Sequence, residues 1–240
     1  MDINKVFSYQ FEDKQWISKL GIGAVITFVP VLNFALSGYI VGIIRNVMQD
    51  SAEPLPNWDD LGKKLIDGLI LFAAGLIYAL PLIIIFLPLG MLAVSSFLSG
   101  NHNLQDMGRL VAGAGSVLLF CLSCFIIIYV LALSVVYPAI LVMFARQGTF
   151  SSCFKFRELY EMITRNAGPY FTAWIVYFGA ALVLGAVLGF INIIVAWIPC
   201  IGWIASFVIS MASTIYLVTV YAHLFGQFSA IALKGNQPLG

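Results

Sequence analysis

The residues of this sequence best suited to proton chemistry are its histidines, whose side chains change charge near neutral pH. One of the two, His223, stands four residues before Gln227 in an uncharged stretch, so the pair would share one helix face. An ionisable residue inside a membrane span is by default a functional hypothesis, here a proton site or a lining group. The alternative is a neutral hydrogen bond between helices, which we favour because residues 166–233 contain no carboxylate.

Arg45, Asp60 and Asp67 form a second group, with Lys63 and Lys64 about one turn before Asp67. Such charges could line a gate or bind a lipid headgroup. They could equally pin two helices together through the forked hydrogen bonding of arginine to a carboxylate. We favour the pin, because Arg45 ends one apolar segment and the acidic residues begin the next. Asp67 and Asp60 are the expected partners of Arg45.

Motifs of catalysis are missing from the sequence. It has no H-E-x-x-H, G-x-S-x-G, P-loop or dinucleotide-binding pattern. Cys121 and Cys124 have the spacing of a zinc or redox pair, but no second pair and no histidine accompany them. We therefore interpret the four cysteines as small apolar residues. The chain is expected not to be an enzyme and to have no catalytic, cofactor-binding or metal-binding residues.

The elements that carry these residues must suit a membrane. Of the 240 residues, 61% are hydrophobic and 10% are charged, and the mean hydropathy is +0.99, against roughly 45–50% and about 25% in soluble domains. Uncharged runs cover 20–44, 68–101, 110–145 and 166–233, and about 20 helical residues cross a bilayer. Because these runs lack the alternation of barrel strands, we predict an all-α, polytopic transmembrane helical bundle. The net charge of +1 gives no basis for a nucleic-acid partner.

A single membrane domain over residues 1–240 is expected. Pro30 and Asn33 interrupt the first apolar run, and its halves of about 13 residues, roughly 20 Å each, fall short of a ~30 Å hydrocarbon core. Residues 17–46 therefore form either a re-entrant or short helical hairpin or one kinked span. The other expected elements are interfacial helices at 1–16 and 150–166, a cytoplasmic linker at 47–66, and transmembrane spans at 67–98, 110–145, 170–197 and 203–233.

The distribution of lysine and arginine favours the hairpin. With a hairpin, eleven of the twelve positive residues fall on one side of the membrane and Arg109 alone falls on the other. One kinked span would place four of them on one side (Lys5, Lys14, Lys19 and Arg109) and eight on the other, which fits the positive-inside rule less well. We therefore predict that both termini are cytoplasmic and that the 99–109 loop and the 198–202 turn lie outside.

Small residues recur at helical spacing in the last two spans, and such faces let helices approach closely. The adjacent helix of the same chain is the simplest partner, and a homo-oligomer through Gly185 is the alternative. On the first reading, Gly185→Leu should disturb the packing of these spans. The predicted packing residues are Ala181, Gly185 and Gly189 on one span and Ser206, Ser210 and Thr214 on the other.

The first third of the chain resembles a known family. The residues that carry the likeness are Pro30-x-Leu32-Asn33, Gly38-Tyr39, Arg45-Asn46, Leu55-Pro56-x-Trp58-x-Asp60 and Tyr78-Ala79-Leu80-Pro81. They resemble a prokaryotic membrane family catalogued as domain of unknown function 4013, and the likeness extends loosely over residues 16 to 230. It implies a multi-pass helical protein of a bacterial or archaeal cytoplasmic membrane, and it carries no activity over to this chain.

Three classes of function fit these observations. We favour a non-catalytic structural, scaffold or accessory subunit of a membrane assembly, whose partners are membrane lipids and either further copies of the chain or other membrane subunits. A small-solute or ion channel or transporter is the alternative, and its path would be lined by uncharged groups such as Asn192, Tyr137 and Ser134. A lipid-handling enzyme ranks last, because no catalytic constellation is present.

Overall fold

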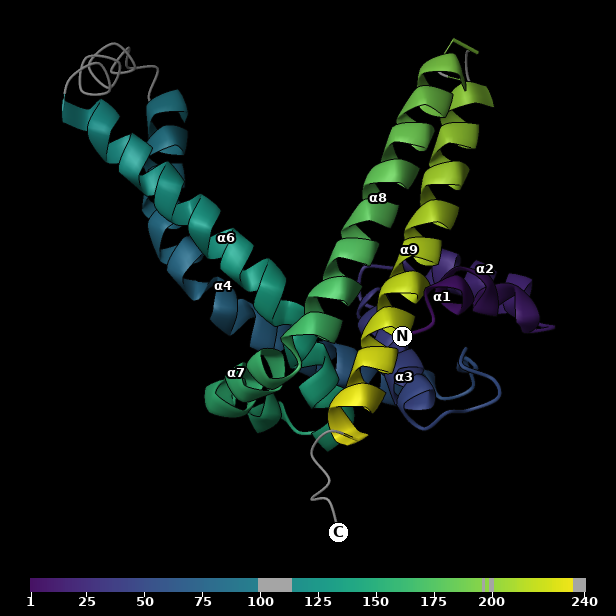
Figure 1. Ribbon diagram of the computed structural model, residues 1–240. Helices are drawn as coiled ribbons and strands as arrows, with labels where there is room; N and C mark the ends of the chain where they lie inside the picture. The colour runs from purple at the N-terminus through teal and green to yellow at the C-terminus, as the bar shows by residue number, and fades with distance from the viewer. Residues whose placement is uncertain (99–113, 196, 199–200, 235–240) are drawn as a thin grey trace. The chain divides into compact units, whose positions relative to one another are not determined.

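The computed structural model describes residues 1–98, 114–195, 197–198 and 201–234, and within these ranges every regular element is helical. This confirms the predicted all-α class. Four helices are long and apolar enough to cross a bilayer, as expected. The elements are α1 (Ile3–Glu12), α2 (Trp16–Ile26), α3 (Phe34–Met48), α4 (Leu61–Leu98), α6 (Ala114–Gln147), the 3-10 helix η1 (Phe150–Phe154), α7 (Phe156–Arg165), α8 (Ala167–Val195) and α9 (Ile201–Lys234) (Figure 1).

The chain folds as two compact units. The first contains Met1–Phe72 and Pro138–Gly240, and the second contains Ala73–Tyr137. Two long helices, α4 and α6, each contribute to both units. In α6 the first unit begins at Pro138, a residue that removes one backbone hydrogen bond from the helix interior.

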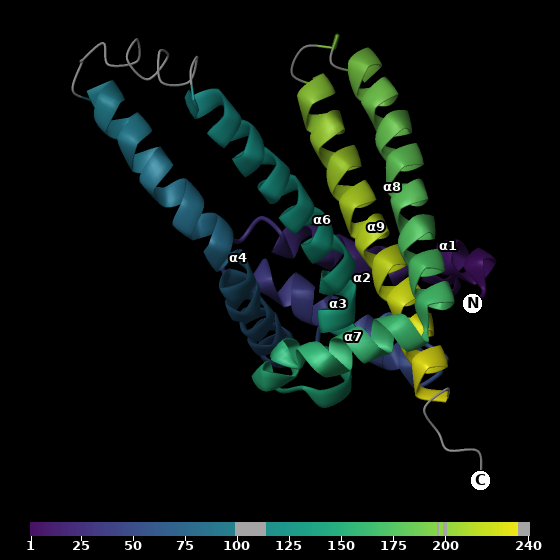
Figure 2. The same cartoon turned by 60° about the vertical axis from the view of Figure 1, so that its left-hand side comes forward.

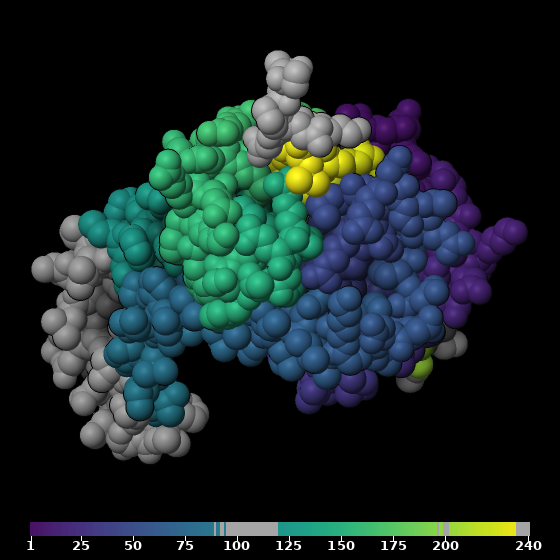
Figure 3. Space-filling view, turned by 90° about the horizontal axis from the view of Figure 1, so that it is seen from below, coloured from purple at the N-terminus to yellow at the C-terminus, as the bar shows by residue number. Residues whose placement is uncertain are grey.

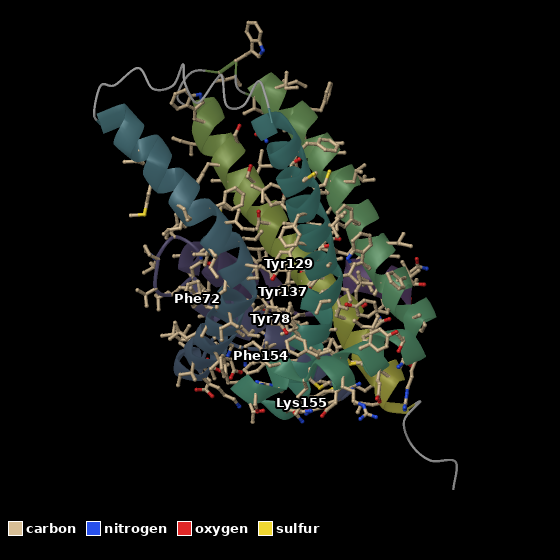
Figure 4. All side chains as sticks on the ribbon, turned by 90° about the vertical axis from the view of Figure 1, so that its left-hand side faces the viewer. Phe72, Tyr78, Tyr129, Tyr137, Phe154 and Lys155 are labelled. Atoms are coloured by element: carbon tan, nitrogen blue, oxygen red, sulfur yellow. The ribbon has the colours of Figure 1, made fainter. Side chains whose placement is uncertain are left out.

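The second unit pairs the later part of α4 with the earlier part of α6. Pro81 lies inside α4, and a proline disturbs the hydrogen bonds of the turn before it. The Tyr129 hydroxyl of α6 donates to the backbone carbonyl of Tyr78, which lies in that turn (Figure 4). A neighbouring helix thus satisfies a polar group near a proline, as the interior of a membrane requires.

In the first unit α8 and α9 run side by side, and the N-terminal helices pack against α9 (Figures 1 and 2). The contacts of α9 are with α1, α2 and α3, whereas α7 contacts α8. The core of this unit lies where these helices meet. Its largest fully buried side chains include Tyr9, Tyr39, Phe144, Tyr170 and Phe225.

Helix α3 lies so close to α4 and α9 that glycine is required at the points of contact. A Cβ atom added at Gly38 would lie 2.0 Å from the carbonyl oxygen of Lys64, and one added at Gly68 would lie 1.7 Å from that of Phe34. On the other side of α3, a Cβ at Gly226 of α9 would lie 2.7 Å from the Cβ of Val47. Only glycine fits at these three positions, so α4 and α9 both touch the backbone or the inner side-chain atoms of α3.

The ends of the helices show how some of these residues are used. Helix α4 begins at Leu61 and has no acidic residue in its first turn, so Asp60 precedes the helix. Asn33 stands at the N-cap position of α3, and its side chain makes no capping hydrogen bond. Pro169 lies in the first turn of α8, where the missing N–H costs little. The predicted outer loop at 99–109 lies outside the described residues.

A matched pair of substitutions in α4 tests the close approach of α3. Gly68→Ala should lower the free energy of unfolding by about 1–3 kcal/mol or more, because the new methyl group would meet backbone. Gly75→Ala, with no heavy atom within 4 Å of its Cβ position, should be neutral or stabilise by up to about 1 kcal/mol. Unfolding of the purified protein in mixed micelles measures both. Equal changes in the free energy of unfolding of the two variants would contradict the close approach of α3 to α4.

Candidate functional site

The charged and polar side chains of the first unit gather where the N-terminal helices, the 49–60 segment, α7 and the ends of α6 and α9 come together. Figure 3 shows this face, with α7 beside the segment that joins α3 to α4. We call it the charged end. Three groups of contacts occupy it: the Arg45 pin, the Lys19 cluster and the α1 dock.

The Arg45 pin joins three helices. Arg45 stands in the last turn of α3, and its Nη1 lies 2.6 Å from Oδ2 of Asp67 in α4. Its Nε donates to the Ala145 carbonyl near the end of α6 at 3.0 Å. The last carbonyls of a helix have no partner within it, and a cation near them is favourable. One guanidinium therefore binds a carboxylate and also caps a helix end, as a pin would require.

A second arginine fastens the same helix end. Arg146 donates from Nε to the hydroxyl of Ser229 at 3.1 Å and from Nη2 to the Ser229 carbonyl at 2.8 Å. Both Arg45 and Arg146 are thus used to join helices, and α6 is tied to α3, α4 and α9. The role of Arg146 was not predicted, because its partner lies 83 residues away in sequence.

The Lys19 cluster (Asp13, Lys19, Leu55, Trp58 and Tyr39) was also not predicted. The Lys19 amine lies 2.6 Å from Oδ2 of Asp13 and donates to the Leu55 carbonyl at 3.0 Å. The side chains of Lys19 and Asp13 are only 6% and 5% exposed. The sequence does contain one signal: a single lysine among the apolar residues 17–29 is costly without a partner.

Asp13 is held in its charged form. Burial raises the pKa of its carboxyl, but hydrogen bonds from Lys19 and from the Gln15 backbone, with the charge of Lys19, outweigh burial and leave the pKa below its usual value. Its Oδ1 accepts the Gln15 N–H at 2.8 Å. The Asp13 carboxylate therefore remains charged through the physiological range.

Aromatic residues complete the Lys19 cluster. The Trp58 indole N–H donates to the Lys19 carbonyl at 2.7 Å. Its ring stacks on Tyr39, with centroids 4.4 Å apart and planes 6° from parallel. A Cβ at Gly42 would lie 3.1 Å from the Pro56 ring. Tyr39, Pro56 and Trp58 all carry the family resemblance, so these motif residues form one packed unit around the backbone of Lys19.

The α1 dock attaches the first helix to α9. The Tyr9 hydroxyl donates to the Thr219 carbonyl at 3.0 Å, and the Gln10 amide donates to the Thr219 hydroxyl at 3.1 Å. Gln227 accepts the Asp2 N–H at 2.9 Å and donates to the Asp2 carbonyl at 3.2 Å. The buried face of α1 is therefore partly polar, with Val6, Tyr9 and Gln10 inside.

His223 and Gln227 do share a face, and that face holds α1. The buried His223 ring stacks on Tyr9 at 4.1 Å between centroids, and its Nδ1 lies 3.3 Å from Nε2 of Gln227. This geometry supports the helix-joining reading of the pair over a proton site.

The predicted small-residue face does not lie between α8 and α9. Gly185 and Gly189 are exposed, and a Cβ at either would meet no heavy atom within 4 Å. Ser210 and Thr214 are exposed as well, and the Thr214 hydroxyl donates to the Ser210 carbonyl of its own helix. Contrary to expectation, Gly185→Leu should not separate these two helices. Ala181 and Ser206 are half-buried.

The remaining candidates are cysteines and uncharged polar residues. Cys121 is exposed and Cys124 half-buried on α6, while Cys153 of η1 is buried, which raises the pKa of its thiol; Cys200 lies outside the described residues. Ser134 and Tyr137 belong to the second unit and Asn192 to the first. Within the described ranges, no group of three or more metal-ligating side chains occurs.

The fold and this site define a class: an all-helical, multi-pass membrane protein whose charged side chains hold its helices together at one end. The sequence profile of the protein of unknown function family DUF4013 matches residues 20–193, and the chain belongs to this family. The resemblance noted in the sequence is thereby confirmed. The matched region contains Tyr39, Leu55 and Trp58 of the Lys19 cluster and the Arg45 pin, whereas Asp13 and Lys19 precede it.

A comparison with known proteins gives one archaeal relative. The chain is 26% identical over 165 residues to the uncharacterized protein MJ1189 of Methanocaldococcus jannaschii. The aligned part covers 69% of this chain and 50% of the relative, so the chain spans about half the length of that protein. No solved structure matches the chain.

Truncation of Arg45 tests the pin. Arg45→Ala should lower the free energy of unfolding by about 3–5 kcal/mol, because it leaves Asp67 partly buried and uncompensated. The matched control, Lys63→Ala, removes an exposed cation at the start of α4 and should change stability by no more than about 1 kcal/mol. Chemical unfolding in detergent measures both variants, and an equal loss in the two would refute the pin.

The Asp13–Lys19 pair predicts a pH dependence of stability. Because the folded state lowers the pKa of Asp13 below the unfolded value of 3.8, the pair stabilises fully above that value, and the stabilisation is lost as pH falls through the lower, folded pKa. Asp13→Asn should remove this dependence and destabilise the protein at neutral pH. Thermal unfolding of wild type and variant from neutral to acidic pH measures it. If the unfolding temperatures of wild type and Asp13→Asn change with pH in the same way across the acidic range, Asp13 makes no such contribution.

Proposed function

We propose that this chain is a non-catalytic structural or accessory subunit of a prokaryotic cytoplasmic membrane assembly. The observation that carries the proposal is a contrast within the first unit. Its charged end is tightly fastened, whereas the long helix α8, which packs on α9, leaves many large apolar side chains exposed. A rigid base with free apolar helix faces suits a protein that positions other membrane components.

The fastening at the charged end supports a rigid base. The Arg45 pin, the Lys19 cluster and the α1 dock use their charged and polar groups to bind one another and the backbone. Groups committed in this way are poorly placed to bind and release a solute. Breaking the Arg45–Asp67 or the Lys19–Asp13 ion pair would leave a buried charge without its partner. A state in which these helices separate is therefore unfavourable.

The open faces support lateral association. The most apolar 18-residue stretch of α8 contains no buried residue, and its exposed side chains include Leu182, Val183, Phe190 and Ile193. In a bilayer, lipid or another helix must cover them. Gly185 and Gly189 lie on the same helix and are exposed, and small residues permit close helix contact in membranes. A partner helix is therefore the proposed occupant.

The proposed topology places the charged end in the cytoplasm. Along α9, the contacts of α1 and α2 run in reverse order from Gln227, through Thr219 and Met211, to Phe207. These 20 residues correspond to about 30 Å of helix. The N-terminal segment thus follows α9 and returns through α3, as a re-entrant hairpin would, which keeps the positive residues on one side.

Site-specific photocrosslinking in the native host tests the subunit proposal. A photoreactive phenylalanine analogue at the exposed Leu182 should give a protein adduct of one defined size. The same analogue at the buried Ala173 of α8 is the matched control and should give none. Mass spectrometry of the adduct would identify a partner subunit or a second copy.

Liposome flux separates this function from the channel alternative. Purified protein in sealed vesicles should leave ion and small-solute leakage at the level of empty vesicles. Solute flux that depends on the protein, with no adduct at Leu182, would favour a channel and contradict the subunit role.

A further inference from the structure

A long apolar groove lies between α2 and the α8–α9 pair. Its volume is 570 Å³, and all of its lining residues belong to the first unit. The groove opens to the surface, and Ile17, Val25 and Val208 along it are exposed. In a bilayer these apolar side chains must be covered, so the groove takes an apolar occupant. Its walls come from α1, α2, α8 and α9, with Phe11, Trp16, Phe28, Leu184, Phe207 and Tyr216 among them.

The groove is produced by particular residues. Small side chains on facing helices, Gly21 and Ala24 on α2 and Ala212 on α9, form part of its lining. A Cβ added at Gly21 would meet no heavy atom within 4 Å, so the groove has room for a side chain at this position of α2. Larger residues at these positions would fill the space, so the sequence itself creates the hollow.

Aromatic rings mark the two ends of the groove. At the end nearer the charged end, Phe11 packs edge-on against Trp16 and faces Tyr216. At the other end, Phe28 lies against Phe207 with ring centroids 4.9 Å apart. From Trp16 to Phe28 the chain advances 12 residues, about 18 Å of helix. That length is close to one leaflet, which is about half of a ~30 Å hydrocarbon core.

The polar atoms of the lining are used within the protein. The Tyr216 hydroxyl donates to the Phe7 carbonyl at 3.1 Å, and the Ser213 hydroxyl donates to the Ile209 carbonyl at 2.8 Å. The groove therefore presents mainly carbon atoms, which suits an alkyl chain and offers nothing to a hydrated solute.

A cation stands at the aromatic end. Lys14 is exposed, two residues before Trp16, and Lys19 nearby is already bound to Asp13. Tryptophan prefers the headgroup level of a membrane, and a lysine beside it attracts anionic headgroups. The groove thus combines an apolar slot with a positive charge at its membrane-surface end, as an anionic amphiphile requires.

The volume argues against a helix as the occupant. One helical turn, about 10 Å across and 5.4 Å high, fills on the order of 420 Å³. The groove would hold little more than a single turn of a partner, whereas one extended alkyl chain fits its length. We propose that this groove binds one alkyl chain of an anionic phospholipid, whose headgroup lies at Lys14.

Quenching of Trp16 fluorescence tests the proposal. The protein, with Trp174, Trp197 and Trp203 replaced by Phe, is placed in phosphatidylcholine bilayers that contain a brominated-chain lipid, either phosphatidylglycerol or phosphatidylcholine, at equal mole fraction. Trp58, the other remaining tryptophan, is buried against Tyr39, and a Trp16→Phe variant supplies its fluorescence for subtraction. Bromine quenches tryptophan on contact. Brominated phosphatidylglycerol should quench Trp16 more strongly, and Lys14→Glu should abolish this excess.

Filling the groove supplies the decisive variant. Gly21→Phe should abolish the excess quenching without loss of thermal stability, because its side chain has open space to occupy. Gly185→Phe, also open but outside the groove, is the matched control and should retain the excess. If Gly21→Phe does not fold, Ala212→Leu fills the groove from the α9 side.

Three outcomes would overturn the proposal. They are equal quenching by the two brominated lipids in the parent protein, excess quenching that persists in the filled variants, and a change of oligomer size on filling the groove. The last outcome would show that a second copy of the chain is the occupant.

Discussion

The close contact of α3 with α4 on one side and with α9 on the other is the constraint on which the first unit depends. This helix is too short to cross a membrane, and Gly38, Gly68 and Gly226 let α4 and α9 close upon it. Once α3 is enclosed, the polar groups at its end have little water to bind. Arg45 must then find partners inside the protein, and it does so at Asp67 and Ala145. The tight packing and the polar contacts of the charged end are thus two results of one geometry.

The helical architecture could be predicted from the sequence because the bilayer imposes it. Long uncharged runs must form helices to satisfy their backbone hydrogen bonds, so long apolar helices were expected, and the described part of the chain contains four of them. Arg45 and Asp67 could be paired because both lie where the chain leaves an apolar segment. The same reasoning placed His223 and Gln227 on one face, since their spacing alone determines it.

The remaining contacts could not be predicted, for a physical reason. Helical spacing shows which residues share a face, yet it does not show what that face meets. Lys19 binds Asp13 across a turn between helices, where no periodicity links them, and Arg146 binds a serine 83 residues away. The small-residue stripe on α8 misled for the same reason: Gly185 has the spacing of a packing face but points away from α9. In a membrane both faces of a helix can be apolar, so hydropathy does not distinguish a face turned to lipid from one turned to protein.

The reciprocal hydrogen bonds between Asp2 and Gln227 have a consequence for how the chain is made. Helices α1, α2 and α3 are synthesised before α9, yet each packs against it. Until α9 is made, Tyr9, Gln10 and Val47 lack their partners Thr219 and Gly226. The first unit can therefore be completed only after α9 has been made, and contacts of such long sequence separation form slowly. A nascent chain that stops before α9 would leave the polar face of α1 without its partners.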